Sequence, residues 1–146
     1  LAGNRELVSE VLKVKSQMDS GMFKPMQLAA VQALAQGPEW FSELNAGYAE
    51  RKVAAGRIFD LLGVDYDHDS SGLFLWGHVR GDNAFLTGDG SASLGERLSD
   101  RLLYDAGVFI TPGFIFGENG RDYVRISLCA KTEVLAEAEN RINICK

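Results

Sequence analysis

The sequence has few cysteines and histidines, and this limits its chemistry. Its two cysteines, Cys129 and Cys145, are far apart and form no C-x-x-C pair, which fits a reducing cytoplasm rather than a disulfide-stabilised secreted protein. The two histidines, His68 and His78, have no serine or cysteine in a G-x-S-x-G elbow to work with. The sequence therefore gives no support for a hydrolytic triad.

The sequence also lacks an excess of basic residues and any long apolar run. It has 15 Lys and Arg against 20 Asp and Glu, so its net charge is −5, and no basic cluster stands out. We therefore expect neither a nucleic-acid partner nor an anionic membrane partner. The uncharged run 106–117 is too short, and too interrupted by glycine and proline, to span a bilayer.

Two segments resemble ligand-binding loops but lack residues that such loops require. The acidic stretch 65–69 begins like a calcium loop, but Ser70 stands where the sharp turn needs glycine and Trp76 where a bidentate glutamate is needed. The glycines of 90–95 are spaced as in a phosphate loop, but Glu96 follows where that loop requires lysine. We therefore predict no metal site, and interpret the first segment as a solvated loop and the second as a helix start.

The first third of the chain predicts two short helices. Asn4 can cap a helix whose apolar stripe extends to Met18, and Ser20-Gly21 interrupts it. Pro25 suits the first turn of a second helix that reaches Leu34.

A long third helix is predicted from Pro38 to Leu62, with Gly63 as its end. At 1.5 Å per residue it would be roughly 37 Å long, which favours a helix that bridges two bodies. A kink or break near Gly47 or Gly56 is the alternative, because glycine weakens a helix by about 1 kcal/mol.

The part of the sequence after Gly63 predicts a small α+β sandwich with helices on one face of a short sheet. Ser93 and Glu96 form a capping box. The other elements that we predict are a buried strand over 73–79, a loop over 81–90 with a short strand at 84–86, strands over 108–116 and 122–129 around a turn at 118–120, and a helix capped by Thr132.

The predicted strand 122–129 places Arg125 on its polar face. Val124 and Ile126 point to the opposite, core face, because side chains alternate along a strand. The guanidinium of Arg125 is a planar, permanently charged fork that suits a carboxylate. A solvated surface arginine is the alternative interpretation.

Three groups of motifs follow one another along the chain. They are Ala2-Gly3-Asn4, then Asp19-Ser20-Gly21 with Gln27 and Ala29-Ala30, then Pro112-Gly113 with Phe116-Gly117 leading to Arg125. In this order and spacing they resemble the C-terminal part of class I/II (fold-type I) aminotransferases that use pyridoxal phosphate, and the resemblance covers nearly all of residues 1–142.

The resemblance implies a division of the chain. Residues 1–37 would be the remnant of the large cofactor-binding domain, 38–63 the bridging helix, and 64–146 the C-terminal small domain. We expect this chain to be a C-terminal piece of a longer protein. In the family, the lysine that forms the Schiff base with the cofactor and the aspartate that holds its pyridine nitrogen lie upstream of the motif that starts here at Leu1.

The resemblance also implies site residues. Arg125 would bind the α-carboxylate of the amino-acid substrate. Phe23 and Lys24 lie in a loop that, in the family, can approach the cofactor site of the neighbouring subunit of a homodimer. Tyr48 and Arg51 match a recurring pattern of the bridging helix, which helix packing explains equally well.

The implied function of the longer protein is amino-group transfer between an amino acid and a 2-oxo acid, in the cytoplasm. The fragment alone, without the lysine, would be inactive. One alternative is the aminotransferase-like, ligand-sensing domain of a transcription regulator. Another is that the chain is only a structural fragment.

Overall fold

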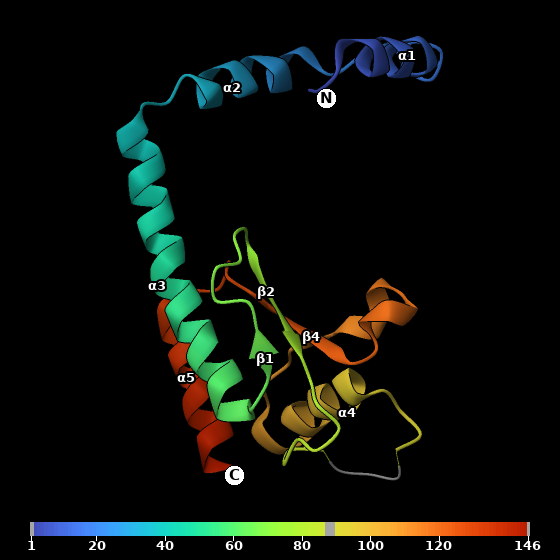
Figure 1. Cartoon of the computed structure of the whole chain (residues 1–146). Helices are drawn as coiled ribbons and strands as arrows, with labels where there is room; N and C mark the ends of the chain where they lie inside the picture. Colours follow the sequence, from blue (N-terminus) through green and yellow to red (C-terminus); the bar gives the residue numbers. More distant parts are fainter. Residues whose placement is uncertain (1, 87–89, 146) are drawn as a thin grey trace. The chain divides into compact units, whose positions relative to one another are not determined.

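The computed structural model describes residues 2–86 and 90–145, and the chain divides into two units, Leu1–Phe41 and Ser42–Lys146 (Figure 1). Among the described residues, no helix combines the length and apolar character that crossing a bilayer requires.

The first unit contains the two predicted short helices, α1 (Arg5–Lys15) and α2 (Lys24–Leu34). Asn4 caps α1 as predicted, because its side-chain oxygen accepts hydrogen bonds from the N–H groups of Glu6 at 2.9 Å and Leu7 at 3.2 Å. Neither helix has a buried residue. The described residues of this unit, 2–41, therefore form no hydrophobic core.

The third helix, α3 (Pro38–Leu62), has the predicted bounds and continues without a break past Gly47 and Gly56. Gly56 lies close to the Tyr66 side chain, since a β-carbon there would be 2.4 Å from its hydroxyl oxygen and would require that side chain to move. Burial raises the pKa of this Tyr66 phenol above its usual value, with a smaller contribution from the charge of Asp60.

The second unit is built on an antiparallel sheet of four strands. These are β1 (Asp65–Tyr66), β2 (Phe74–His78), β3 (Thr111–Pro112) and β4 (Tyr123–Ser127), in the order β1-β2-β4-β3. In this register Arg125 of β4 lies opposite Trp76 of β2 and Thr111 of β3. Arg125, the candidate substrate-binding residue of the sequence analysis, thus lies on β4, one of the two central strands.

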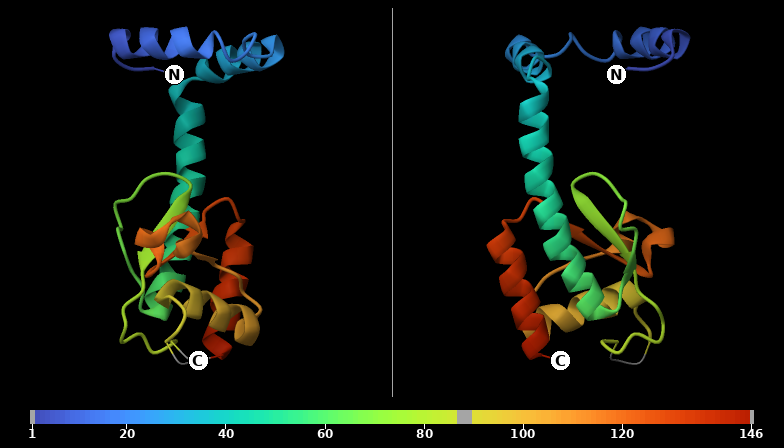
Figure 2. Two further views of the ribbon diagram at one scale, coloured as in Figure 1. Left: turned by 90° about the vertical axis from the view of Figure 1, so that its right-hand side faces the viewer. Right: turned by 60° about the vertical axis from the view of Figure 1, so that its left-hand side comes forward.

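Helices cover one face of this sheet, which confirms the predicted α+β sandwich. Figures 1 and 2 show α3 and α5 (Thr132–Ile144) side by side, and an ion pair of 3.1 Å joins Arg57 Nε of α3 to Glu139 Oε2 of α5. The helix α4 (Leu94–Arg101) and the π-helical turn η1 (Leu102–Ala106) complete the core. The largest fully buried apolar side chains are Phe59, Ile58, Leu62, Leu75, Leu98, Ile142, Val79 and Val124.

Three predictions about the second unit need correction. The strand within 73–79 is buried on one face only, because its residues alternate between exposed and buried. Residues 84–86 form no strand, and the predicted loop over 81–90 extends into 87–89, which lie outside the described residues. Thr132 is the first residue of α5 rather than its cap, since Lys131 holds the capping position and makes no side-chain cap bond.

The predicted strand over 108–116 is also wrong for most of its length. Only Thr111–Pro112 pairs with β4, and the chain then turns into two 3₁₀ helices, η2 (Gly113–Phe116) and η3 (Glu118–Gly120). Pro112 has no N–H for a further ladder bond, and the backbones of Gly113 and Gly120 approach closely. A β-carbon on Gly113 would lie 2.3 Å from the Gly120 carbonyl oxygen.

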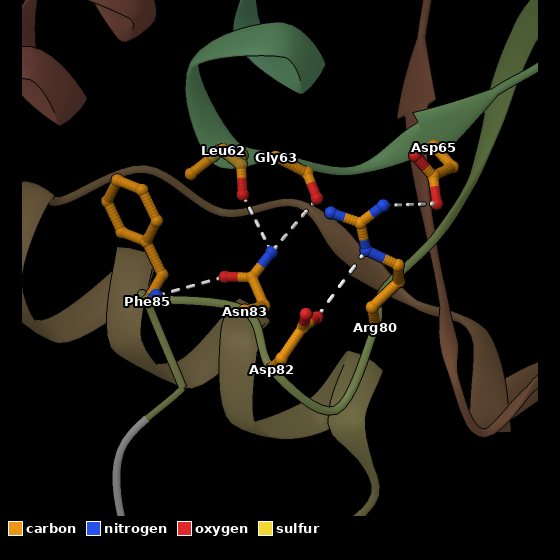
Figure 3. A network of polar contacts seen from close by, with 7 residues as sticks. All are labelled: Leu62, Gly63, Asp65, Arg80, Asp82, Asn83 and Phe85. Carbon is orange, nitrogen blue, oxygen red and sulfur yellow. Dashed lines mark hydrogen bonds and ion pairs between the residues drawn. The ribbon is translucent and has the colours of Figure 1, made fainter.

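The C-terminal end of α3 is held by the side chain of Asn83 (Figure 3). Its amide nitrogen donates to the carbonyl oxygens of Leu62 at 2.7 Å and Gly63 at 3.2 Å, while its oxygen accepts from the N–H of Phe85 at 2.9 Å. These bonds satisfy carbonyls that a helix end leaves unpaired. Asn83 thus connects the end of α3 to the loop after β2.

Replacing Asn83 with alanine is expected to lower the free energy of unfolding by about 1–3 kcal/mol, because partly buried carbonyls lose their donor. Chemical denaturation followed by far-UV circular dichroism measures this. Asn119→Ala is the matched control, since Asn119 is exposed in η3. Equal stability of both variants would show that water replaces Asn83 at no cost.

Candidate functional site

Arg125 lies in the middle of β4, on the face of the sheet that points away from the core. Its neighbours Val124 and Ile126 are buried, whereas Arg125 is half-buried. This confirms the alternation predicted from the sequence. The strand backbone is fixed on both sides by β2 and β3, so the arginine projects from a rigid position.

Two phenyl rings lie against the guanidinium of Arg125. Its central carbon, Cζ, is 4.2 Å from the ring centre of Phe74 and 4.3 Å from that of Phe116. Phe74 opens β2 and Phe116 ends η2, so the rings come from segments far apart in the sequence. These distances are well within the range of a cation–π interaction.

Further aromatic rings extend this surface along the two central strands. Trp76 stacks on Tyr123 with ring centres 5.4 Å apart and an interplanar angle of 15°. Trp76 also meets Phe116 edge-on at 5.7 Å, and His78 contacts Tyr123 at 5.0 Å. Phe116 is therefore the last ring in a row of contacts that begins at His78 and continues through Tyr123 and Trp76. The ring of Phe116 itself is exposed.

The positive charge of Arg125 has no acidic partner within residues 2–86 and 90–145, and its guanidinium donates no hydrogen bond to them. By contrast, Arg121 pairs with Glu118 at 3.3 Å and Arg141 with Glu137 at 2.8 Å. An arginine stays charged at any physiological pH. A half-buried guanidinium with free donors is suited to bind an anion from outside this part of the chain.

Arg125 also borders a groove of about 470 Å³ between α5 and the side of the sheet formed by β3 and β4. Thr111, the register partner of Arg125, lines it too. Its acidic residue, Glu137, accepts a hydrogen bond from Arg141. The rest of the groove is mostly apolar, and Glu137 makes no ion pair with Arg125.

Close backbone contacts hold the segments around the site. The N–H of Gly95, at the start of α4, donates to the carbonyl of Arg121 at 3.0 Å, just before β4 begins. The buried hydroxyl of Ser99 donates to the carbonyl of Ile110 at 2.6 Å, just before β3. The helix α4 therefore helps to position β4, which carries Arg125, and its neighbour β3.

The other residues suggested by the resemblance lie elsewhere. Phe23 and Lys24 are exposed at the start of α2, in the first unit. Arg51 of α3 donates to the carbonyl of Leu128 at 3.3 Å and lies over the ring of Tyr48 at 5.3 Å. Tyr48 and Arg51 therefore contact each other, and Arg51 links α3 to the segment after β4.

Sequence reasoning missed Phe74 and Phe116 as partners of Arg125. A signal for Phe74 existed, since residues two apart on a strand share a face and Phe74, Trp76 and His78 follow that spacing. Phe116 had no such signal, because its segment was expected to be a strand and is a 3₁₀ helix.

Cys129, two residues after the end of β4, is exposed. Cys145 is half-buried, and its thiol donates to the carbonyl of Asp105 at 3.1 Å. Neither cysteine contributes to the surface around Arg125.

Comparison with known families gives one broad match. The family described as "Aminotransferase class I and II" matches residues 1–142. Among curated proteins, the chain is 37% identical over 144 residues to an LL-diaminopimelate aminotransferase of Aquifex aeolicus, covering 99% of this chain and 35% of that protein. It is 33% identical over 141 residues to the LL-diaminopimelate aminotransferase of Maridesulfovibrio salexigens, covering 97% and 34%.

Solved structures agree in fold. Substrate-bound BacF of Bacillus subtilis is similar with a TM-score of 0.75 and 30% identity, covering 98% of this chain and 34% of that one. An aminotransferase of Staphylococcus aureus has a TM-score of 0.76 at 24% identity, covering 98% and 35%, and this similarity concerns the fold alone. The chain thus spans about a third of the length of the curated relatives that it matches.

Proposed function

Because the chain belongs to the class I and II aminotransferase family, we propose that the whole protein transfers an amino group between an amino acid and a 2-oxo acid. The relatives named above are LL-diaminopimelate aminotransferases, which makes that diamino acid one donor to test. Reaction in the cytoplasm and assembly as a homodimer are part of the same proposal, and both rest on the family resemblance.

The observation that carries this proposal is the state of Arg125. Arg125 is half-buried on a paired strand, its guanidinium lies against two phenyl rings, and it has no acidic partner among the described residues. Such a group binds a carboxylate through two parallel, charge-assisted hydrogen bonds. Arg125 would therefore hold the α-carboxylate of either substrate and orient the bond to be broken at the neighbouring carbon.

The described residues of this chain do not by themselves fit pyridoxal phosphate. A Schiff-base lysine works with a depressed pKa, in a desolvated or cationic setting. Here Lys13 and Lys15 form exposed ion pairs with acidic residues, Lys24 and Lys131 are exposed, and Lys52 donates to the carbonyl of Ser70 at 2.5 Å. We propose that the reactive lysine lies upstream of Leu1, and that Phe23 and Lys24 approach the cofactor of the other subunit.

The proposed division into domains follows the family pattern. Residues 1–37 would end the large domain, 38–63 would bridge, and 64–146 would form the small domain. The separation of the chain into units at Phe41 and Ser42, a few residues into α3, supports the first boundary. The absence of buried residues in α1 and α2 supports a large domain that packs against them.

The 146-residue chain alone is expected to form no stoichiometric, site-specific bond with pyridoxal phosphate, because its described lysines are exposed or, for Lys52, bonded to a backbone carbonyl. The measurement is borohydride reduction after mixing, followed by proteolysis and mass spectrometry. Scattered low-level labelling is expected from exposed lysines. A single, fully labelled lysine would contradict this expectation.

The proposal itself is tested with the whole protein loaded with pyridoxal phosphate. Amino donors, LL-diaminopimelate among them, are assayed with 2-oxoglutarate as acceptor, and glutamate formation is followed. Transfer from at least one donor is expected. If no donor reacts while the cofactor is bound at full occupancy, the protein is not an aminotransferase.

The alternative of a ligand-sensing domain in a transcription regulator finds no support in the relatives, which are named as aminotransferases. A regulator would bind amino acids without turning them over. The same assay therefore separates the two readings.

A further inference from the structure

We propose that Phe74 and Phe116 form an aromatic clamp that fixes the guanidinium of Arg125 and leaves only its N–H edge open to a ligand. The clamp makes Phe74 and Phe116 positioning residues, which act on the substrate through Arg125. It also limits the bound group to a flat anion, a carboxylate, that approaches in the plane of the guanidinium. The inference rests on the proposed role of Arg125 as the substrate's carboxylate ligand.

The distances place the rings on different sides of the guanidinium. Both ring centres lie little more than 4 Å from the same carbon atom. Two rings that were both this near to Cζ, and on the same side of it, would contact each other. Phe74 and Phe116 are both described and make no ring contact with each other. In the proposed clamp, each ring therefore covers one flat face of the cation.

Stacking of this kind occupies the faces of the cation and leaves its donors free. The guanidinium is planar, and its five N–H groups point outward within that plane. A ring over each face excludes water there and does not compete for the N–H groups. Because Arg125 has no acidic partner among the described residues, these donors remain available to a ligand that approaches in the plane of the guanidinium.

The two rings of the clamp are themselves held in place, so they can fix the side chain of Arg125 before a ligand binds. Phe116 is supported by Trp76, and its helix η2 is held where Gly113 meets Gly120. Phe74 lies in β2, in register with Ser127 of β4. Arginine loses much rotamer freedom when it binds a ligand, so fixing it beforehand raises affinity.

The first arm of the test measures the clamp in the 146-residue chain. Stacked rings shift the side-chain proton resonances of Arg125 upfield, and these are assigned by their loss in Arg125→Lys. Phe74→Leu and Phe116→Leu are each expected to remove part of that shift. Phe114→Leu is the matched control, since Phe114 lies in the same short helix and makes no cation–π contact with Arg125. Unchanged Arg125 resonances in both test variants would overturn the clamp.

The second arm measures positioning in the whole protein, with its best amino donor. Phe74→Leu and Phe116→Leu are each expected to raise KM about 2- to 30-fold, the range that cation–π energies span. Phe116→Tyr keeps the ring and should retain the original KM, while bound cofactor and circular dichroism stay the same in all variants. If the resonances shift but KM does not, the clamp does not position the ligand and the inference fails.

The two proposals fail in different ways. If Arg125→Lys leaves KM and kcat/KM unchanged, Arg125 binds no substrate carboxylate, and the proposed function of this residue fails together with the positioning role. If Arg125→Lys weakens the donor and the two leucine variants do not, only the clamp is refuted.

Discussion

Arg125→Lys in the whole protein is expected to lower kcat/KM for amino donors roughly 10- to 100-fold. The substitution keeps the positive charge but removes the planar fork, so one of two charge-assisted hydrogen bonds to the carboxylate is lost, at about 1.5–3 kcal/mol. The rate falls as well as the affinity, because a poorly placed substrate presents the wrong bond for proton transfer. Steady-state kinetics with the best amino donor measures both parameters.

Arg121→Lys is the matched control for this prediction. Arg121 lies four residues earlier, is exposed and pairs only with Glu118 among the described residues, so kinetics should stay the same. The content of pyridoxal phosphate should be unchanged in both variants. If Arg125→Lys loses cofactor, Arg125 binds the cofactor or stabilises the fold rather than binding substrate. If kcat/KM is unchanged, Arg125 is a surface residue without a role in the reaction.

Gly95→Ala is expected to destabilise the second unit by about 3 kcal/mol or more, although alanine is normally the better helix residue. A β-carbon at this position would lie 2.0 Å from the carbonyl oxygen of Tyr123 and 3.0 Å from that of Arg121. Both obstacles are backbone atoms, so the clash is relieved only if α4 and β4 separate. Denaturation of the 146-residue chain, followed by circular dichroism, measures the loss.

Gly47→Ala tests the same substitution in an unobstructed helix. Its β-carbon would meet nothing within 4 Å, so the helix propensity alone should act and stabilise the chain by up to about 1 kcal/mol. If Gly95→Ala also stabilises, the approach of α4 to β4 is not as close as the structure has it. Since Tyr123 precedes Arg125 by two residues, a shift there would also displace the guanidinium.

Local signals were sufficient for most of the helices. Pro38 and Gly63 set the ends of α3, because proline suits a first turn and Gly63 adopts a left-handed φ of 63°. Ser93 caps α4 through the N–H of Glu96 at 3.4 Å, as its capping box predicts. Each of these features depends on residues within a few positions of one another.

The strand around Thr111 could not be predicted in the same way. Its apolar sequence suits a strand, but Pro112 ends the ladder and Gly113 rests on the backbone of Gly120. The second contact exists only after the chain has turned back on itself. Local propensity does not contain that information, and tertiary packing overrides it.

The same distinction applies to the site. That Arg125 would point away from the core followed from the alternation of Val124 and Ile126 around it, which is a property of the strand alone. Its contacts with Phe74, 51 residues earlier, and with Phe116 depend on long-range structure. They require the pairing of β2 with β4 and the turn into η2. Periodicity along one strand specifies a direction for a side chain, whereas its neighbours in space come from long-range register, which only the assembled sheet defines.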